Sequence, residues 1–324
     1  MKPVRRILGI GAPTLDYLIT VEKEILANLV GELEGMEYIN RETFDDLLIK
    51  SKGRPHQTVG GSTTNKLKVL SSLGHSCVLH GMIGRDEVSA CVNNSLRNYP
   101  IQLELIKTEY PSTIVLCLVD PYGHRTFRTV AGASTRFRGK DVVQSVFNES
   151  KLVILEGYSL TNGCLLEKAI SLSKETKARI VFDLACFEFC STHQEYLLSS
   201  ILPEVDIIIA NEKEIKTLLD MKPKQGCAFL AGINKHVIVT MGSKGCWVSH
   251  GSSLEYCPAN PQIAIDTTGA GDYFAGGFLH GLLSGKDIKT CGAWGARLAS
   301  EIVLHVGTDL PSTTWKKIKN SIQS

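Results

Sequence analysis

The sequence predicts an α/β protein built on a mainly parallel central sheet. From residue 150 onward, short apolar runs alternate with helical segments, which is typical of a parallel sheet covered on both faces. Polar and glycine-rich turns follow these runs, so they gather at one edge of the sheet. The 324 residues, 43% hydrophobic and 21% charged, suffice for a large core. We expect one domain over residues 1–324, although this length also allows two smaller ones.

Composition narrows the class of partner. Lys and Arg total 35 and Asp and Glu total 33, so nothing general favours nucleic acid or an acidic membrane surface. The ten cysteines include no Cys-x-x-Cys pair, which indicates free thiols in a reducing compartment. Cys186, Cys190 and His193 match no common zinc spacing, so packing is the favoured interpretation. The basic N-terminus resembles neither a signal peptide nor a membrane span, and we expect a cytoplasmic protein.

A first buried strand is predicted over residues 6–10. The Gly-x-Gly at residues 9–11 suggests a dinucleotide fingerprint, but Thr14 stands at the sixth position and Pro13 disfavours a helix there. This argues against a nicotinamide-dependent dehydrogenase. Asp16 follows the strand end, where ligands of open α/β sheets bind, with turn capping as the alternative.

A glycine-rich helix entry follows a stretch of weak helix and edge strand over residues 17–50. Gly60 and Gly61 precede a Ser-Thr-Thr run, Asn65, and leucines at helical spacing. As a bare pattern this is also ordinary N-cap chemistry. The pattern predicts a helix that begins just after Gly61.

A β-hairpin is predicted over residues 114–130. A strand at 77–82 comes before it, followed by Asp86, which we interpret as a helix cap. The turn Asp-Pro-Tyr-Gly at 120–123 separates two apolar runs. Arg125 and Arg128 lie on this hairpin, either as solvated side chains or within reach of a phosphate.

Two later strand ends carry polar patterns. Asn211 and Glu214 lie three positions apart, which places them on one face of a helix. An Asn that caps the helix explains the pattern equally well. Thr240 ends the next strand and leads to Gly242 and Gly245. On its own, this strand-to-turn glycine pair is weak evidence.

The most informative stretch is residues 265–279. An apolar helical pattern begins close to Ala270, directly after a glycine-rich turn. The first turn of a helix has unpaired N–H groups, and glycine lets a ligand approach them, so this is an anion site. Asp272 in that turn either complements the helix dipole or deprotonates a hydroxyl that accepts a phosphoryl group.

The segment Asp-Thr-Thr-Gly-Ala-Gly-Asp at 266–272 resembles the C-terminal signature of the ribokinase-like (PfkB) carbohydrate and nucleoside kinases. Three other segments resemble further motifs of this family and occur in the family's order: residues 60–65, 211–214 and 240–245. The resemblance implies a catalytic base at Asp272 and an anion hole at Gly269, Ala270 and Gly271. It implies substrate contacts by Asp16, Gly60, Gly61 and Asn65, nucleotide contacts by Asn211, Thr240, Gly242 and Gly245, and magnesium held near Glu214 through water.

The resemblance also implies a fold and a reaction. The expected fold is a ribokinase-like three-layer sandwich with a small β-sheet lid, formed by segments near 14–50 and 110–132. The expected cofactors are ATP and Mg²⁺; the sequence does not decide whether a monovalent cation is needed, or the oligomeric state. Three phrases, at 155–158, 210–212 and 266–268, are similar to the bacterial adenosine-kinase-like branch.

An adenosine-like nucleoside is therefore the expected acceptor, with Tyr17, Phe127 and Tyr158 as candidates to stack on a purine. A free sugar of the ribose or fructose type is the alternative acceptor. A non-catalytic ligand-binding protein of the same fold is a second alternative, against which the intact Asp272 argues. No nucleic acid or membrane partner is expected.

Overall fold

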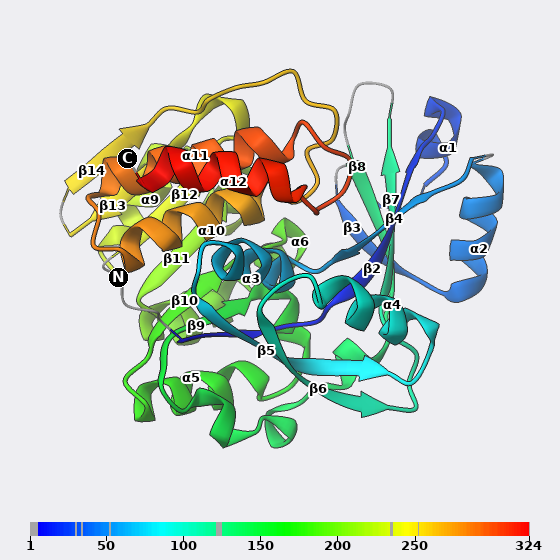
Figure 1. Ribbon diagram of the computed structural model, residues 1–324, viewed down its shortest axis with the longest axis horizontal. Helices are drawn as coiled ribbons and strands as arrows, with labels where there is room; N and C mark the ends of the chain where they lie inside the picture. The colour runs from blue at the N-terminus through cyan, green and yellow to red at the C-terminus, as the bar shows by residue number, and fades with distance from the viewer. Residues whose placement is uncertain are drawn as a thin grey trace.

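A nine-stranded sheet forms the centre of the molecule (Figure 1). The computed structural model describes residues 6–29, 31–33, 35–51, 53–120, 125–233, 236–251 and 253–323. Strands β12 to β6 in the sheet order pair in parallel, whereas β13 and β14 pair antiparallel at one edge. The order is β14 (Ser253–Cys257), β13 (Cys246–His250), β12 (His236–Thr240), β11 (Ile207–Asn211), β10 (Arg179–Asp183), β9 (Ser150–Glu156), β1 (Arg6–Ile10), β5 (Ser76–Gly84) and β6 (Ile101–Thr108).

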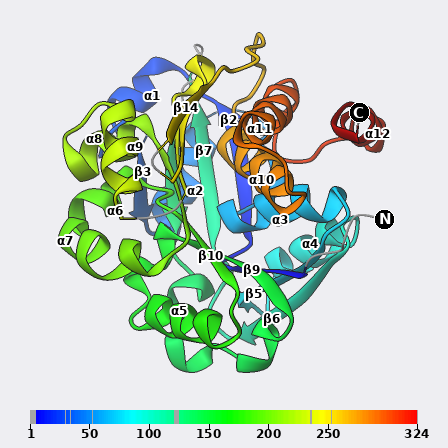
Figure 2. The same cartoon turned by 90° about the vertical axis from the view of Figure 1, so that its left-hand side faces the viewer.

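Helices cover both faces of this sheet, as Figure 2 shows. One side carries α3 (Ser62–Ser72), α10 (Ala270–Leu283) and α11 (Ile288–Ile302), with α4 (Glu87–Leu96) below them and α12 (Ser312–Gln323) packed outside α11. The other side carries α5 (Leu165–Glu175), α6 (Phe187–Thr192), α7 (Gln194–Tyr196), α8 (Glu212–Leu219) and α9 (Pro223–Ala231). The result is the three-layer arrangement that the sequence predicts.

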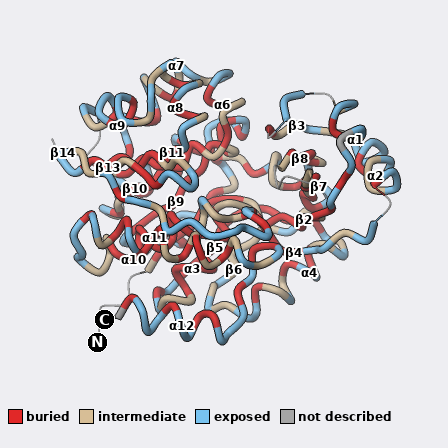
Figure 3. Tube along the Cα trace, turned by 90° about the horizontal axis from the view of Figure 1, so that it is seen from above, coloured by how far each residue is buried: buried red, intermediate tan, exposed pale blue. Residues whose placement is uncertain are grey.

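A second sheet of five strands stands beside the first (Figure 1). Its order is β3 (Met36–Ile39), β8 (Arg125–Val130), β7 (Ile114–Val119), β2 (Thr14–Thr20) and β4 (His56–Gly60). Helices α1 (Lys23–Ala27) and α2 (Arg41–Lys50) lie on its outer side, where most of their residues are exposed (Figure 3). Four of its strands come from the two expected segments, and β4 is an addition that the sequence did not predict.

Apolar sequence explains why the central strands lie where they do. In β11, four successive residues at 207–210 are buried because helices cover both faces of the sheet. Burial is concentrated in the large sheet and the helices against it (Figure 3). Two apolar clusters result, one on each face. The parallel strands all point the same way, so their carboxyl ends form one edge, facing the second sheet.

Several smaller predictions are also confirmed. Strands β7 and β8 pair antiparallel as a hairpin, and Asp86 caps α4 by accepting from the N–H of Ser89 at 3.0 Å. The predicted turn at 120–123 lies outside the described residues beyond Asp120. Among the helices that the structure describes, we find none with the length and apolar character needed to cross a lipid bilayer.

Candidate active site

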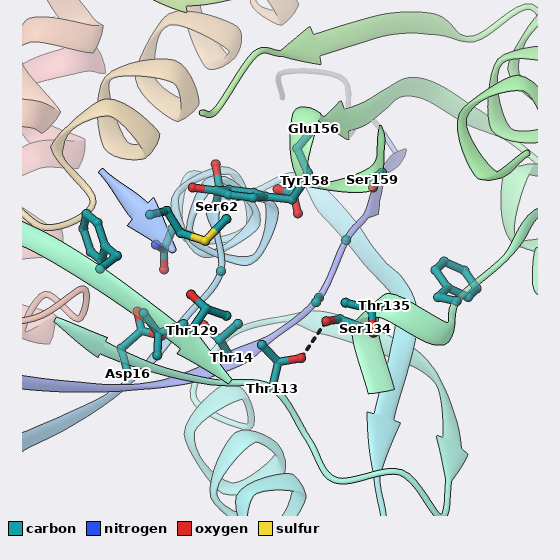
Figure 4. A pocket seen from close by; sticks show the side chains of 18 of the residues that line it. Thr14, Asp16, Ser62, Thr113, Thr129, Ser134, Thr135, Glu156, Tyr158 and Ser159 are labelled. Carbon is teal, nitrogen blue, oxygen red and sulfur yellow. Dashed lines mark hydrogen bonds between the residues drawn. The ribbon is translucent and has the colours of Figure 1, made fainter. Parts of the chain in front are cut away.

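A pocket lies between the two sheets, at the carboxyl edge of the larger one. Figure 4 shows its walls: Asp16 and Thr129 come from the second sheet, while Glu156 ends β9 and Tyr158 follows it. Ser62 stands at the start of α3, and the beginning of α10 completes the lining. Residues that are far apart in the sequence therefore converge on one cavity.

The backbone at the start of α10 leaves N–H groups available to a ligand. Gly269 has φ 76°, in the left-handed region that favours glycine, and it turns the chain into the helix. The N–H of Ala270 donates to the carbonyl of Thr267 at 3.1 Å, so it is not free for a ligand. Within the described residues the N–H groups of Gly271 and Asp272 have no hydrogen-bond partner, and a Cβ at Gly271 would meet nothing within 4 Å. An anion could approach these two amides directly.

Asp266 anchors this turn from behind. One of its oxygens accepts from the N–H and the hydroxyl of Thr268, at 2.9 and 2.7 Å. Its other oxygen accepts from the N–H of Gly307 at 2.8 Å.

Arg125 of β8 lies 3.1 Å from Asp266 and also donates to Thr267, so the second sheet is tied to the turn. Arg125 is thus engaged with protein groups, and the guanidinium of Arg128 is buried and donates to the carbonyl of Phe127.

Asp272 projects from the first turn of α10 into a network of donors. Its Oδ1 accepts from the hydroxyl of Ser62 at 2.7 Å and from the ammonium of Lys66 at 2.8 Å. Its Oδ2 accepts from the amide of Asn65 at 2.9 Å. The side chain stays 16% exposed, toward the pocket that it lines. A carboxylate oxygen can accept two hydrogen bonds, so Oδ2 has capacity for a ligand hydroxyl.

Asn65 has one polar atom without a partner. Its Oδ1 is buried and unpaired among the described residues, although it lines the pocket. Leaving such an acceptor unsatisfied costs about 1–3 kcal/mol, so a hydroxyl donor from a ligand is the expected partner. Gly61, the N-cap of α3, has φ 95° and packs so closely on Ala12 that a Cβ would lie 2.2 Å from its carbonyl oxygen. The helix entry predicted from the sequence is therefore built to present Asn65.

Asp16 and Gly60 are matched across two neighbouring strands. A Cβ on Gly60 would lie 1.9 Å from Oδ2 of Asp16, so any larger residue there would displace the carboxylate. Asp16 accepts from the hydroxyl of Thr14 at 2.6 Å. Burial raises the pKa of Asp16 to about 6, with Thr14 and Lys68 opposing the increase. The structure places Asp16, Gly61 and Asn65 around the same cavity as Asp272.

The residues predicted to contact the nucleotide lie outside this pocket, at the adjoining ends of β11 and β12. Asn211 and Thr240 are register partners on these strands. Gly242 and Gly245 have φ 56° and 91°, and a Cβ at Gly245 would lie 2.3 Å from the carbonyl oxygen of Cys257. These glycines shape the loop after β12 as the sequence predicts.

Glu214 is buried and forms a capping box with Asn211. Its two oxygens accept from the N–H and the side-chain amide of Asn211, at 2.8 and 2.6 Å. Burial, and then the nearby Asp183, raise the pKa of Glu214. No cluster of three or more His, Cys, Asp or Glu suited to a metal occurs in the described ranges.

The predicted aromatic candidates divide. Phe127 and Tyr158 line the pocket, but Tyr17 packs edge-on against Phe44, with ring centroids 5.3 Å apart. Tyr17 is therefore set aside as a candidate, because successive side chains of β2 point to opposite faces and Asp16 is the one that lines the pocket. Met82 and Phe137, not predicted, add further apolar surface to the pocket.

Three charged residues lie at the site although the sequence predicted no role for them there: Lys66, Glu156 and Asp183. Lys66 lies 2.8 Å from both Asp183 and Asp272. Glu156 accepts from the N–H and hydroxyl of Thr63 at 2.8 and 2.6 Å, and burial raises its pKa to about 7. A signal for Lys66 was present, because it shares the apolar helical face of Leu70, four residues later.

Comparisons with known proteins agree on one family. The chain matches the pfkB family of carbohydrate kinases over residues 28–315. An uncharacterised sugar kinase of Archaeoglobus fulgidus is 28% identical and covers 74% of this chain and 95% of its own length. The adenosine kinase of Saccharomyces cerevisiae is 26% identical, with 94% and 96% covered.

Solved structures show the same fold. The crystal structure of adenosine kinase from Sinorhizobium meliloti superimposes with a TM-score of 0.90 at 23% identity, covering 98% of this chain and 100% of the other. A probable sugar kinase from Rhizobium etli also has a TM-score of 0.90, at 22% identity with 99% of each chain covered. These structures match both sheets, and the predicted ribokinase-like fold is confirmed.

Proposed function

The chain belongs to the pfkB family of carbohydrate kinases, and on this premise we propose that it phosphorylates a primary hydroxyl of an adenosine-like nucleoside. Membership makes it an ATP-dependent kinase of sugars or nucleosides; the acceptor and the residue roles are our proposal. We also place it in the cytoplasm. A ribose- or fructose-type sugar is the second candidate acceptor, favoured by the similarity to the sugar kinase of Archaeoglobus fulgidus.

One observation carries the proposed chemistry. The carboxylate of Asp272 lines the pocket, and the unpaired N–H groups of residues 271 and 272 lie in the same turn of α10. The amides can hold an anionic phosphoryl group, and the carboxylate can hold the hydroxyl that receives it. Phosphoryl transfer to a hydroxyl needs both an anion site and a base close together, and family membership favours this reaction over others with the same need.

The proposed step is an in-line displacement. The acceptor oxygen forms a bond to the γ-phosphorus while the bond between that phosphorus and the β–γ bridging oxygen breaks. The hydroxyl proton passes to Oδ2 of Asp272, and the products are ADP and a phosphate ester. Asp16 and Asn65 hold the acceptor in line with the phosphoryl group, which contributes to the rate by orienting the reactants. The amides stabilise the charge that develops during transfer.

The nucleotide is proposed to lie over the ends of β11 and β12. Asn211, Thr240, Gly242 and Gly245 form the edge on that side of the α10 turn, and Glu214 would orient water around a magnesium ion. Bound Mg²⁺ would neutralise charge on the donor phosphates. The capping box between Asn211 and Glu214 holds both side chains at the end of β11.

The shape of the pocket supports a nucleoside. Beyond Asp16 and Asn65, the cavity continues between apolar side chains, including Phe137 and Leu165, toward the polar groups of Ser134 and Asn162. A free pentose would fill the part near Asp272 and leave this region empty. A flat base with hydrogen-bonding edges suits both its apolar walls and its polar end.

Replacing Asp272 with Asn tests the proposed base. We expect the variant to fold and to bind a non-hydrolysable ATP analogue as the wild type does, because the side chain keeps its size. Turnover should fall by at least about 100-fold, the size typical for general acid–base catalysis. Turnover at the wild-type rate would refute the assignment.

A panel of acceptors then identifies the substrate. ATP and Mg²⁺ would be supplied with adenosine, other nucleosides, ribose and fructose, and ADP formation would be measured. We expect the highest kcat/KM with adenosine or a related nucleoside. A higher value with a free sugar would establish the second candidate, and no turnover with any of them would favour a ligand-binding protein.

A further inference from the structure

Lys66 is a buried cation at the proposed base. It follows Asn65 on α3, and its side chain is 0% exposed. The ammonium lies 2.8 Å from Oδ2 of Asp183 and 2.8 Å from Oδ1 of Asp272, and it also donates to the hydroxyl of Ser62. An ammonium has three donors, and all three are used by protein groups. Lys66 therefore acts on a ligand through its neighbours and not by direct contact.

The surroundings of Lys66 explain why a cation is needed there. Two carboxylates share one ammonium, and Glu156 also lies near enough to favour its charged form. Burial alone would lower the pKa of Lys66, but these carboxylates outweigh it and raise the pKa above its usual value. Without the ammonium between them, the carboxylates of Asp183 and Asp272 would be neighbouring like charges that repel each other.

Asp183 fixes the position of the ammonium from the opposite side. It ends β10, and its Oδ1 accepts from the N–H of Ala185 at 3.0 Å, which leaves Oδ2 for Lys66. Lys66 and Ser62 then occupy Oδ1 of Asp272, while Asn65 contacts Oδ2. Oδ2 can accept one more hydrogen bond, and the side chain that carries it lines the pocket.

We propose that Lys66, anchored by Asp183, is a positioning residue that orients the carboxylate of Asp272 toward the acceptor hydroxyl. The proposal deepens the kinase reaction proposed above and rests on it. During transfer the hydroxyl proton goes to Oδ2 of Asp272, and Lys66 keeps its own protons. The ammonium fixes the base without itself touching the acceptor or the nucleotide.

Two variants test this role. Lys66→Met removes the ammonium at similar side-chain length, and Lys66→Met/Asp183→Asn also removes one carboxylate, so that the net charge of the site matches the wild type. We expect kcat to fall about 100-fold in both, the scale of a misplaced catalytic group. The acceptor KM and the Kd for a non-hydrolysable ATP analogue should stay within about threefold, because only the transition state is affected. Crystal structures of both variants should show the Asp272 carboxylate rotated away from the pocket.

Lys68→Met is the matched control. Lys68 lies two residues further along α3 and is equally buried, but its ammonium pairs with Asp309 at 2.9 Å and contacts the carbonyl of Val59. This variant should melt at a lower temperature than the wild type, with kcat at saturating acceptor within about twofold of it. Its acceptor KM should rise, because Lys68 opposes the increase in the pKa of Asp16. A loss of kcat equal to that of Lys66→Met would mean that any buried charge on α3 has the same effect, and would overturn the proposal.

The remaining outcomes also decide. A charge-matched double variant with wild-type kcat and an unmoved Asp272 would show that Lys66 only stabilises the fold. If neither variant folds, Lys66 is a folding determinant and the assignment is wrong. If the wild type phosphorylates no acceptor, the proposed function fails, but the orientation of Asp272 in the variant crystals still tests the positioning role separately.

Discussion

At the residue scale, Asp16 is the clearest link between burial and binding. Its carboxylate is 8% exposed, lines the pocket and faces Gly60, which has no side chain to crowd it. Only the ionised form accepts hydrogen bonds at both oxygens, as a pair of vicinal hydroxyls requires. Because burial raises its pKa to about 6, this form is lost within an accessible pH range.

The pH dependence of acceptor binding follows from this. As the pH falls through about 6, Asp16 takes up a proton, and the KM for the acceptor should rise. Asp16→Asn should raise that KM by about 10- to 100-fold at pH 8, the value of a charged hydrogen bond, and should abolish the rise near pH 6. Steady-state kinetics from pH 5 to 9 measure both effects. The same pH dependence in the variant would assign it to another group, such as Glu156, whose pKa burial raises to about 7.

The folded protein also responds to the ionisation of Asp16. A carboxyl whose pKa is raised by folding favours the folded state at low pH and loses that contribution as the pH rises from about 4 to about 6. Removing the charge should therefore not lower the melting temperature at pH 8. The kinetic effect of Asp16→Asn can then be separated from unfolding.

At the element scale, α10 serves two purposes along its length. Its first turn opens onto the pocket, and its later turns pack against α11 through glycines. A Cβ at Gly277 would lie 2.8 Å from the carbonyl oxygen of Trp294 and 3.0 Å from the Cα of Gly295. A Cβ at Gly271 would meet nothing within 4 Å. The same substitution at these two glycines should therefore have opposite consequences.

Gly271→Ala should leave the melting temperature unchanged or higher, because Ala is favoured over Gly in a helix by up to about 1 kcal/mol. Its methyl group occupies the approach to the amides, so kcat/KM for ATP should fall at least about 10-fold. Gly277→Ala should lower the free energy of unfolding by about 1–3 kcal/mol through overpacking, while the folded enzyme keeps its activity. Thermal melts and kinetics on both variants make the comparison. Normal activity in Gly271→Ala would contradict the anion site.

The elements were largely predictable from the sequence, whereas the connections between them were not. The apolar run at 6–10 and the helix entry at Gly61 are local patterns, and both appear where expected. Local patterns do not reveal partners that are distant in sequence. Lys66 and Asp183 meet across 117 residues because the carboxyl ends of parallel strands share one edge, and this depends on strand order. The orientation of Tyr17 likewise depends on which face of β2 is covered.

At the scale of the whole molecule, polar contacts join the second sheet to the larger part of the molecule. The ion pair of Arg125 with Asp266 is one of them, and its side chains are only 12% and 6% exposed. It connects the hairpin strand β8 to the segment that precedes α10. Breaking a buried ion pair by removing one partner leaves the other charge uncompensated, which is strongly destabilising.

Arg125→Met should therefore lower the free energy of unfolding by about 3 kcal/mol. Arg85→Met is the matched control, because Arg85 pairs with Glu109 at 3.0 Å with side chains 59% and 88% exposed; an exposed pair contributes about 1 kcal/mol or less. Denaturant unfolding of both variants measures the difference.

Hydrogen exchange should also quicken in β7 and β8 of Arg125→Met before the central strands are affected, because the lost link holds only the second sheet. Adenosine at 100 times its Kd should restore up to about 2.7 kcal/mol, since it would bind both sheets at once. Equal losses in the two variants, or faster exchange throughout the central sheet, would show that Arg125 supports the whole fold and does not specifically join its two parts.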